Sequence, residues 1–216
     1  MKPEFFRRAP ALLALAALLF LGPIRVLAGP PLICHAYNIG SAKSLPAGSD
    51  RFGTSPAYDR GHLVADTLGL LTADTPILVR METLRRAAIY ATGNLRVWDG
   101  QKYTHIDQEL GAALIAKLRE RTTTGDDAAR ALALFDLGFF AETLRQTGLD
   151  PALDGYAILA KAAGSLQENP EVEFALALAS TQPKRIEHAA HLAKARAVAQ
   201  PGSLLALNLE THFGKS

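Results

Sequence analysis

Cys34 and His35 are adjacent residues whose side chains are suited to nucleophilic, redox and metal chemistry. A thiolate is a strong nucleophile and a ligand for soft metal ions when a nearby cation lowers its pKa, and Cys34 is the only cysteine among the 216 residues. Adjacent side chains of an extended segment point to opposite faces, so these two do not converge on one atom. We therefore expect Cys34 to be a small buried side chain among apolar neighbours, with a redox, metal-binding or intermolecular disulfide role as the alternative.

His188 and His191 stand three residues apart in a segment predicted to be helical, which places both on one helix face. Two such imidazoles could bind zinc or copper if a third ligand, such as His212 or His62, came from elsewhere. Solvated histidines on a helix surface are the main interpretation, because the spacing fixes no third ligand. No other cofactor is expected. The candidate ligands for a transition metal are Cys34, His35, His188 and His191.

A third cluster, Asp59, His62 and Asp66, has the residue types of general acid–base catalysis. On a helix His62 and Asp66 lie four residues apart and could share a face, with the carboxylate orienting the imidazole. No serine elbow, phosphate-binding glycine loop or calcium loop accompanies them in the sequence, so no catalytic residue is predicted. Helix capping and solvation are the main interpretation, and a hydrolase using His62 and Asp66 is the least favoured alternative.

Residues 1–28 have the pattern of a secretory signal peptide. Basic residues including Arg7 and Arg8 precede an apolar run over residues 11–21, and we place the cleavage site after Ala28. This run is too short for a helix that crosses a hydrocarbon layer of roughly 30 Å. The sequence therefore predicts export to the periplasm or secretion from the cell, with no stable membrane anchor after cleavage.

The composition is that of a packed globular protein, and it excludes some classes of function. Of the residues, 49% are hydrophobic and 20% are charged. The net charge of the full chain is +2, but removing the signal segment leaves 19 basic and 20 acidic residues, so no basic excess remains for binding nucleic acid. A single cysteine excludes an intrachain disulfide and a four-cysteine zinc site.

Two parts follow the signal segment. Residues 29–57 are dense in glycine, proline and serine, which predicts an extended N-terminal segment that is partly docked on the rest of the protein. Residues 58–216 predict one helical domain, because apolar residues recur at spacings of three and four. Only residues 95–103 could form a short hairpin. Prolines that follow a capping or polar residue predict helix starts at Pro76, Pro151, Pro170 and Pro183.

Two clusters inside the predicted helices have a structural interpretation. Glu82 with Arg85 and Arg86 has the three- and four-residue spacing of ordinary ion pairs on a helix face, each of which stabilises a helix by a few tenths of a kcal/mol. The three phenylalanines within residues 135–140 gather on one helix and predict core packing.

An internal repeat lies in the C-terminal half. Residues 159–162 and residues 192–195 are both Leu-Ala-Lys-Ala, and they belong to seven identities between residues 156–177 and residues 189–210. The period is close to that of tetratricopeptide helix pairs, roughly 34 residues, and Leu134, Leu137 and Gly138 resemble part of that repeat's first helix. We therefore expect an all-α fold of antiparallel helical hairpins, arranged either as an irregular bundle or as a degenerate tetratricopeptide-like stack.

Residues 30–46, with the sequence PPLICHAYNIGSAKSLP, resemble the start of a group of uncharacterised secreted bacterial proteins. The resemblance is specific in this segment. The residues that follow share only a general helical pattern with that group. It implies an exported bacterial protein and attaches no activity to it.

These observations together predict an exported helical scaffold that binds an unknown protein or peptide in the cell envelope and is not an enzyme. Stacked helical hairpins form a concave surface that suits recognition. The alternative is a thiol- or metal-binding protein that uses Cys34 and His35.

Overall fold

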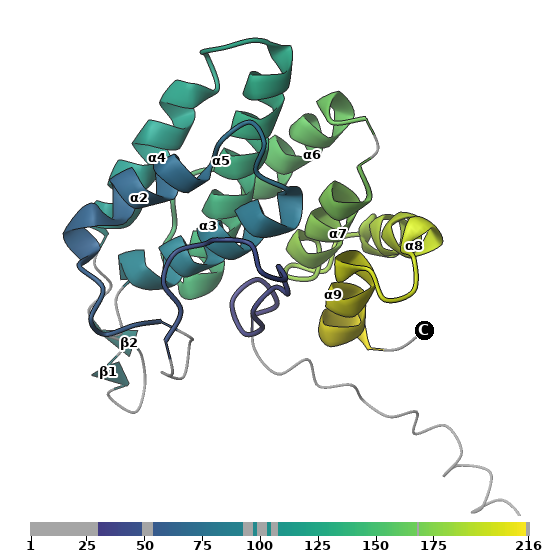
Figure 1. The fold of residues 1–216 in the computed structure, drawn as a ribbon, viewed down its shortest axis with the longest axis horizontal. Helices are drawn as coiled ribbons and strands as arrows, with labels where there is room; N and C mark the ends of the chain where they lie inside the picture. The colour runs from purple at the N-terminus through teal and green to yellow at the C-terminus, as the bar shows by residue number, and fades with distance from the viewer. Residues whose placement is uncertain are drawn as a thin grey trace, which may run out of the picture.

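The fold is all-α, as the sequence predicts. The computed structural model describes residues 30–48, 54–92, 97–98, 103–104, 108–167 and 169–214, so the predicted signal segment lies outside the described residues. Within the described part, no helix is long and apolar enough to cross a membrane. Figure 1 shows the elements in order: the 3-10 helix η2 (Arg60–His62), α2 (Leu63–Leu70), α3 (Ile77–Thr92), β1 (Val97–Trp98), β2 (Tyr103–Thr104), α4 (Glu109–Arg121), α5 (Asp127–Thr147), α6 (Gly155–Ser165), α7 (Pro170–Ala179), α8 (His188–Val198) and α9 (Leu204–Phe213).

The two strands form one short antiparallel hairpin, in which Val97 pairs with Thr104 and Trp98 with Tyr103. The hairpin interrupts the helices within the region that the sequence predicts for it. Everything else that the structure describes is helix, turn or irregular chain.

Side-chain caps define several helix starts. Pro170 is the first residue of α7, as predicted, and the side chain of Asn169 accepts a hydrogen bond from the Glu171 backbone N–H at 2.9 Å. The start predicted at Pro151 is wrong, because Asp154 caps α6 instead, and α6 begins at the following residue.

The start predicted at Pro183 is also wrong, because this residue lies in a series of turns that precedes α8. Proline suits a turn as well as the first position of a helix, so its presence does not distinguish the two. The helix predicted from Pro76 does form, with α3 beginning at the next residue.

Helices α3 and α5 form the centre of the molecule. Nearly every residue of α3 is buried, and Phe135, Phe139 and Phe140 of α5 are fully buried, which confirms the predicted phenylalanine core. Helix α6 lies close along α5 because Gly138 faces it: a Cβ on Gly138 would come within 2.6 Å of the Leu159 nitrogen. Only a glycine permits this approach of two helix backbones.

The helices of the C-terminal half recur at a nearly fixed interval. Helix α6 spans residues 155–165 and α8 spans residues 188–198, and the offset between them is the one that aligns residues 159–162 with residues 192–195. Helix α7 spans residues 170–179 and α9 spans residues 204–213, an offset that is one residue longer. Helices α6 and α7 are thus matched by α8 and α9 in length and nearly in spacing, whereas the closest packing in this half of the chain is between α5 and α6 and between α7 and α8.

The segment of residues 30–48 lies across the ends and sides of distant helices (Figure 1). Its backbone donates to side chains of two of them: Gln146 of α5 accepts from the Leu32 N–H at 2.8 Å, and Asn208 of α9 accepts from the Asn38 N–H at 2.8 Å. Leu32 and Leu45 are fully buried. The segment is thus part of the packed structure although it has no regular secondary structure.

Candidate functional site

The buried carboxylate of Glu82 in α3 holds the N-terminal segment. It accepts hydrogen bonds from the Tyr37 backbone N–H at 2.9 Å, from Arg85 at 2.8 and 3.0 Å and from Arg86 at 2.6 Å. Arg85 in turn donates to the Ile33 carbonyl oxygen at 3.0 Å. The prediction of ordinary ion pairs on a helix face is therefore wrong: the pairs form within α3, but Glu82 is fully buried, and hydrogen bonds of Glu82 and Arg85 connect α3 to the N-terminal segment.

Cys34 and His35 follow directly after this anchor and are both exposed. The expected burial of Cys34 among apolar neighbours is wrong: the flanking Ile33 and Tyr37 turn inward, and the turn that begins at Pro31 places Cys34 on the surface. The ring of His35 meets the ring of His212 edge-on, with centroids 5.5 Å apart.

His212 of α9 is a buried imidazole in an aromatic setting. Its ring stacks on Tyr37 at a centroid distance of 4.9 Å and meets Phe174 edge-on at 5.5 Å, and neither ring nitrogen makes a well-formed hydrogen bond. Burial lowers the pKa of His212 to about 4, with smaller contributions from His35 and Arg85, while Glu82 and the Pro31 backbone act in the opposite direction. The imidazole is therefore neutral at pH 7.

His188 and His191 connect α8 to the preceding helices. A ring nitrogen of His188 lies 2.8 Å from the Ala177 carbonyl oxygen, and Nδ1 of His191 lies 2.6 Å from Oε2 of Glu173. Nε2 of His191 lies 3.0 Å from the Tyr156 hydroxyl. The interpretation of these histidines as solvated is wrong, because both are half-buried and bonded to α6 or α7.

The predicted metal ligands do not come together as one cluster. Cys34 and His35 lie on the N-terminal segment, and His188 and His191 lie on α8 with their Nδ1 atoms engaged. Among the residues that the structure describes, no group of three or more His, Cys, Asp or Glu side chains is placed to hold a metal ion.

The predicted acid–base pair is also arranged differently. His62 lies 3.5 Å from Asp59, with both side chains largely exposed, whereas Asp66 accepts a hydrogen bond from the Tyr58 hydroxyl at 2.8 Å. Burial and this hydrogen bond raise the pKa of Tyr58. Asp59 also accepts from the Gly61 backbone N–H at 2.8 Å, which is the capping role expected for it. His62 and Asp66 thus have different partners.

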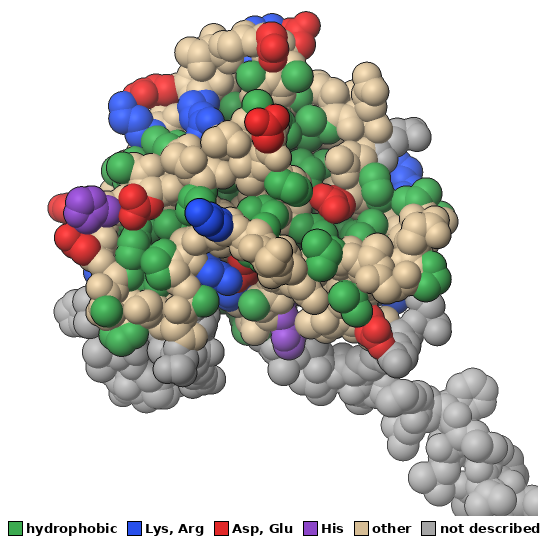
Figure 2. Space-filling view, viewed as in Figure 1, with side chains coloured by type: hydrophobic (Ala, Val, Ile, Leu, Met, Phe, Trp, Pro, Cys, Tyr) green, Lys and Arg blue, Asp and Glu red, His purple; other side chains and the backbone are tan. Residues whose placement is uncertain are grey.

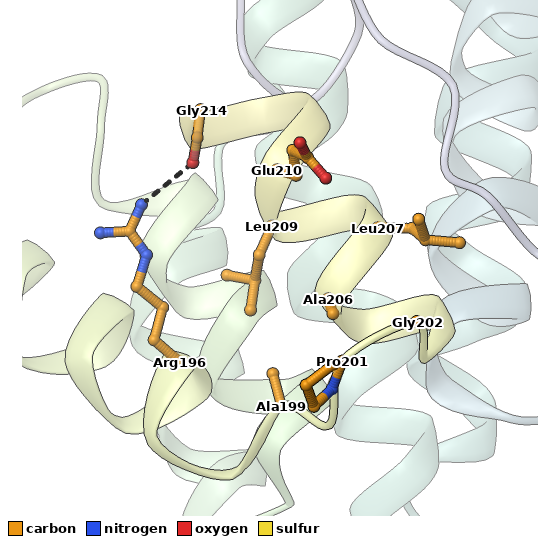
Figure 3. Close-up of a pocket in the computed structure, with 9 residues that line it drawn as sticks. All are labelled: Arg196, Ala199, Pro201, Gly202, Ala206, Leu207, Leu209, Glu210 and Gly214. Carbon is orange, nitrogen blue, oxygen red and sulfur yellow. Dashed lines mark hydrogen bonds between the residues drawn. The ribbon is translucent and has the colours of Figure 1, made fainter. Parts of the chain in front are cut away.

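An open pocket of about 390 Å³ lies between α8 and α9 (Figure 3). Its wall is mainly apolar, with Leu207 and Leu209 from α9 and Pro201 from the connection between the helices. Arg196 stands on one side, where it donates to the Gly214 carbonyl oxygen at 3.4 Å while its buried Nε has no hydrogen-bond partner. Glu210 of α9 also lines the pocket, which thus combines an apolar wall with one cationic and one anionic side chain.

The exposed large hydrophobic side chains of the described residues are confined to this end of the chain. They are Ile186, Val198, Leu204 and Leu207. Ile186 is 94% exposed, and Leu207 is both 39% exposed and part of the pocket wall. Figure 2 shows apolar side chains at the surface over α8 and α9. The sequence does not predict this surface, because an internal repeat and a helical apolar pattern do not tell which sides of α8 and α9 stay uncovered.

Comparison of the chain with family models, with curated proteins and with solved structures finds no match.

Proposed function

We propose that this protein is an exported helical scaffold that binds a peptide segment of another protein in the pocket between α8 and α9. The segment carries a large apolar side chain beside an acidic group. The observation that carries the proposal is that the exposed large hydrophobic residues of the described chain all lie between positions 186 and 207, and that one of them, Leu207, lines a pocket of about 390 Å³.

The apolar wall supplies the affinity in this proposal. Contiguous exposed apolar surface costs solubility and is typical of a surface that binds a partner. Leu207 and Leu209 would lose water from their side chains when a partner's apolar residue enters, at about 25 cal/mol per Å² of apolar area buried. A side chain of leucine, phenylalanine or methionine size fits this wall.

Arg196 supplies the specificity. Its guanidinium has five N–H donors, its Nε is buried without a partner, and one Nη atom makes a single long bond to Gly214. A carboxylate accepts hydrogen bonds from a guanidinium in a planar, two-bond geometry. An acidic residue of the partner, or its terminal carboxylate, would therefore accept hydrogen bonds from the Nη atoms of Arg196, of which one makes the bond to Gly214.

The repeated helices support a scaffold rather than an enzyme. Helices α6 and α7 recur as α8 and α9 at offsets close to the period of tetratricopeptide pairs, roughly 34 residues, and we interpret them as a degenerate stack of this kind. Among the residues that the structure describes, no helix follows α9 to cover it. The signal sequence predicted over residues 1–28 supports an envelope location for the partner.

A displayed library of random peptides, selected on the purified chain, tests the proposal. We expect the enriched peptides to share a large apolar residue next to Asp, Glu or the terminal carboxylate. Leu207→Glu should weaken the binding of a synthesised consensus peptide at least about tenfold, because it places a charge in the apolar wall. Ala193→Glu, at an exposed position of α8 outside the pocket, is the matched control and should leave the affinity unchanged.

Arg196→Gln separates the two parts of the recognition. It should weaken the binding of peptides with an acidic residue. It should leave unchanged the binding of a variant peptide in which that residue is amidated. Selection of peptides without a shared pattern, or equal binding by the wild-type and Leu207→Glu proteins, would contradict the proposal.

A thiol- or metal-dependent function is the second candidate, favoured by one observation. The buried His212 has two ring nitrogens without a well-formed hydrogen bond and meets His35, the residue next to the exposed Cys34. Imidazole and thiolate are ligands that copper(I) accepts, and here the two imidazoles are the ones in ring contact. Native mass spectrometry of the exported protein without reductant, followed by copper(I) titration against a chelator, tests this candidate. Cys34→Ser and His35→Gln should both abolish a retained ion or adduct; an unmodified apo monomer that does not compete for copper(I) would contradict it.

A further inference from the structure

Ile186 has the most exposed large hydrophobic side chain among the described residues. It is 94% exposed and lies in the turns between α7 and α8. It does not line the pocket between α8 and α9, which we call the peptide pocket. A single exposed hydrophobic side chain is ordinary at a protein surface, so the groups around Ile186 decide whether it can recognise anything.

Opposite charges stand on the two sides of Ile186 in the chain. Lys184 precedes it, Glu187 follows it, and both side chains are exposed. The guanidinium of Arg185 is engaged within the chain, because it lies 4.1 Å from the centroid of the Tyr156 ring. The surface offered by this turn is therefore a large aliphatic side chain with a cation on one side and an anion on the other.

The peptide pocket has a complementary set of side chains. Leu207 and Leu209 of α9 form its apolar wall, Arg196 is its cation and Glu210 is its anion. The two charged side chains come from different helices, Arg196 from α8 and Glu210 from α9 (Figure 3). A ligand that matches this pocket carries an apolar side chain together with one acidic and one basic group.

We propose that the turn around Ile186 of one copy of the chain occupies the peptide pocket of a second copy. Ile186 covers the apolar wall, Glu187 lies beside Arg196, and Lys184 lies beside Glu210. The inference rests on the proposed function, because it names one occupant of the same pocket. That occupant has the proposed composition, a large apolar side chain next to an acidic group.

The occupant must be a second copy because Ile186 cannot reach the pocket of its own chain. Ile186 precedes His188, the first residue of α8, and Arg196 lies eight residues further along that helix, a rise of about 12 Å. Ile186 and the pocket thus lie toward opposite ends of α8. The contact joins two different surfaces, so it either closes as a two-fold pair or continues head to tail.

The dimensions fit a weak association. A pocket of about 390 Å³ is large enough for the side chain of an isoleucine. Val198 and Leu204, which are also exposed, lie within two residues of pocket-lining positions and would enlarge the contact. Since one turn enters one pocket, the buried area falls at the low end of protein interfaces, below about 1,200 Å², where complexes are transient.

The experiment is sedimentation velocity of the purified chain from about 1 to 200 μM, a range that covers dissociation constants of weak complexes. We expect the average mass to rise above that of the monomer at the upper end. Ile186→Glu should raise the dissociation constant at least about tenfold. Ala113→Glu, at an exposed position of α4, is the matched control and should leave it unchanged. A wild type that stays monomeric, or equal association by Ile186→Glu, would overturn the inference.

A charge exchange tests the pairing of the two surfaces. Lys184→Glu and Glu210→Lys each place like charges together, and both positions are exposed, so the fold should tolerate them. Each substitution should weaken the association at least about threefold, and the double variant should recover the wild-type value. Two weakened single variants without recovery in the double variant would overturn the pairing.

The peptide pocket itself provides the last comparison. Leu207→Glu should abolish the self-association, and the consensus peptide selected on the chain should dissociate it by competition. A monomeric wild type that still binds this peptide would overturn the inference and leave the proposed function standing. Self-association that Leu207→Glu abolishes, in a chain that selects no peptide, would support the inference and contradict the proposed function.

Discussion

The side-chain amide of Asn208 makes two hydrogen bonds with the backbone of Asn38. It accepts from the N–H of Asn38 at 2.8 Å and donates to the carbonyl oxygen of the same residue at 2.9 Å. The Asn208 side chain therefore pairs with the N-terminal segment as a neighbouring strand would. It also donates to Leu204 in its own helix at 2.8 Å, so the amide is held in one orientation.

Asn208→Ala should destabilise the protein by about 2 kcal/mol. The substitution removes the two hydrogen bonds to the Asn38 backbone, which is left without these partners, and each such bond contributes about 1 kcal/mol net. The measurement is the free energy of unfolding in urea. Asn38→Ala is the control, because that side chain makes only an exposed bond to Gly40, and it should change stability by less than about 0.5 kcal/mol. Equal effects of the two substitutions would contradict the pairing.

Glu82→Ala should destabilise the protein by about 3–5 kcal/mol and release the N-terminal segment. It removes the partner of Arg85, whose guanidinium is 3% exposed and would remain charged inside the protein. Denaturant unfolding measures the loss, and limited proteolysis should show new cleavage within residues 34–48. Glu120→Gln is the control. Its pair with Lys117 is more than half exposed and contributes less than about 1 kcal/mol.

His212→Phe should change the pH dependence of stability. The pKa of His212 is about 4 in the folded protein and about 6.5 when unfolded. Between these pH values the imidazole is protonated in the unfolded chain and neutral in the folded protein. The free energy of unfolding of the wild type therefore falls as the pH decreases from 6.5 to 4, by about 3 kcal/mol from this group. Phenylalanine keeps the stacking on Tyr37 and cannot be protonated.

The measurement is the difference in unfolding free energy between His212→Phe and the wild type from pH 7.5 to pH 4. We expect a difference within about 1 kcal/mol at pH 7.5, because no well-formed hydrogen bond of the ring is lost, and a growing advantage for the variant below pH 6.5. Asp136 titrates in the same range with the opposite sign, since its folded pKa is raised to about 6, but it is common to both proteins and cancels. A difference that stays constant with pH would show that His212 is not held neutral.

His191→Ala should destabilise the junction of α6, α7 and α8 by about 2 kcal/mol. The ring connects Glu173 at 2.6 Å with the Tyr156 hydroxyl at 3.0 Å, so its loss leaves both groups with fewer partners. Tyr156→Phe removes the hydrogen bond between the tyrosine hydroxyl and His191, and should lower the free energy of unfolding by about 1 kcal/mol. In a double-mutant cycle the two substitutions should show a coupling of about 1 kcal/mol, and additive effects would contradict a shared network.

Local sequence patterns predicted much of the fold. The helical spacing, the capping residue before Pro170 and the phenylalanines of α5 indicated the fold class and part of the core. The helix starts predicted at Pro151 and Pro183 are wrong, because proline is equally suited to irregular chain and to turns, in which these two residues lie. Residues 159–162 recur at residues 192–195, and α8 follows α6 at the same offset along the chain. The repeated sequence therefore agrees with the positions of these two helices.

The candidate sites were harder to predict, because contacts between distant segments create them. Glu82 has the spacing of a surface ion pair, and only the docking of Tyr37 and Ile33 above it makes it a buried anchor. The sequence suggests His212 only as a possible third metal ligand. Nothing in the sequence indicates the aromatic rings that enclose it. The peptide pocket depends on which face of α9 is left uncovered, and no local pattern encodes that.

The pairing of Asn38 with Asn208 also sets an order of events during folding. The two residues are 170 positions apart, and α9 is the last helix that the structure describes. A chain that emerges from the ribosome N-terminus first exposes Leu32 and Tyr37 long before the surface of α9 exists. Closing the loop between Asn38 and Asn208 costs entropy, and the hydrogen bonds that offset this cost can form only when both residues are present. The segment of residues 30–48, which is synthesised well before α9, is therefore among the last parts to reach its place.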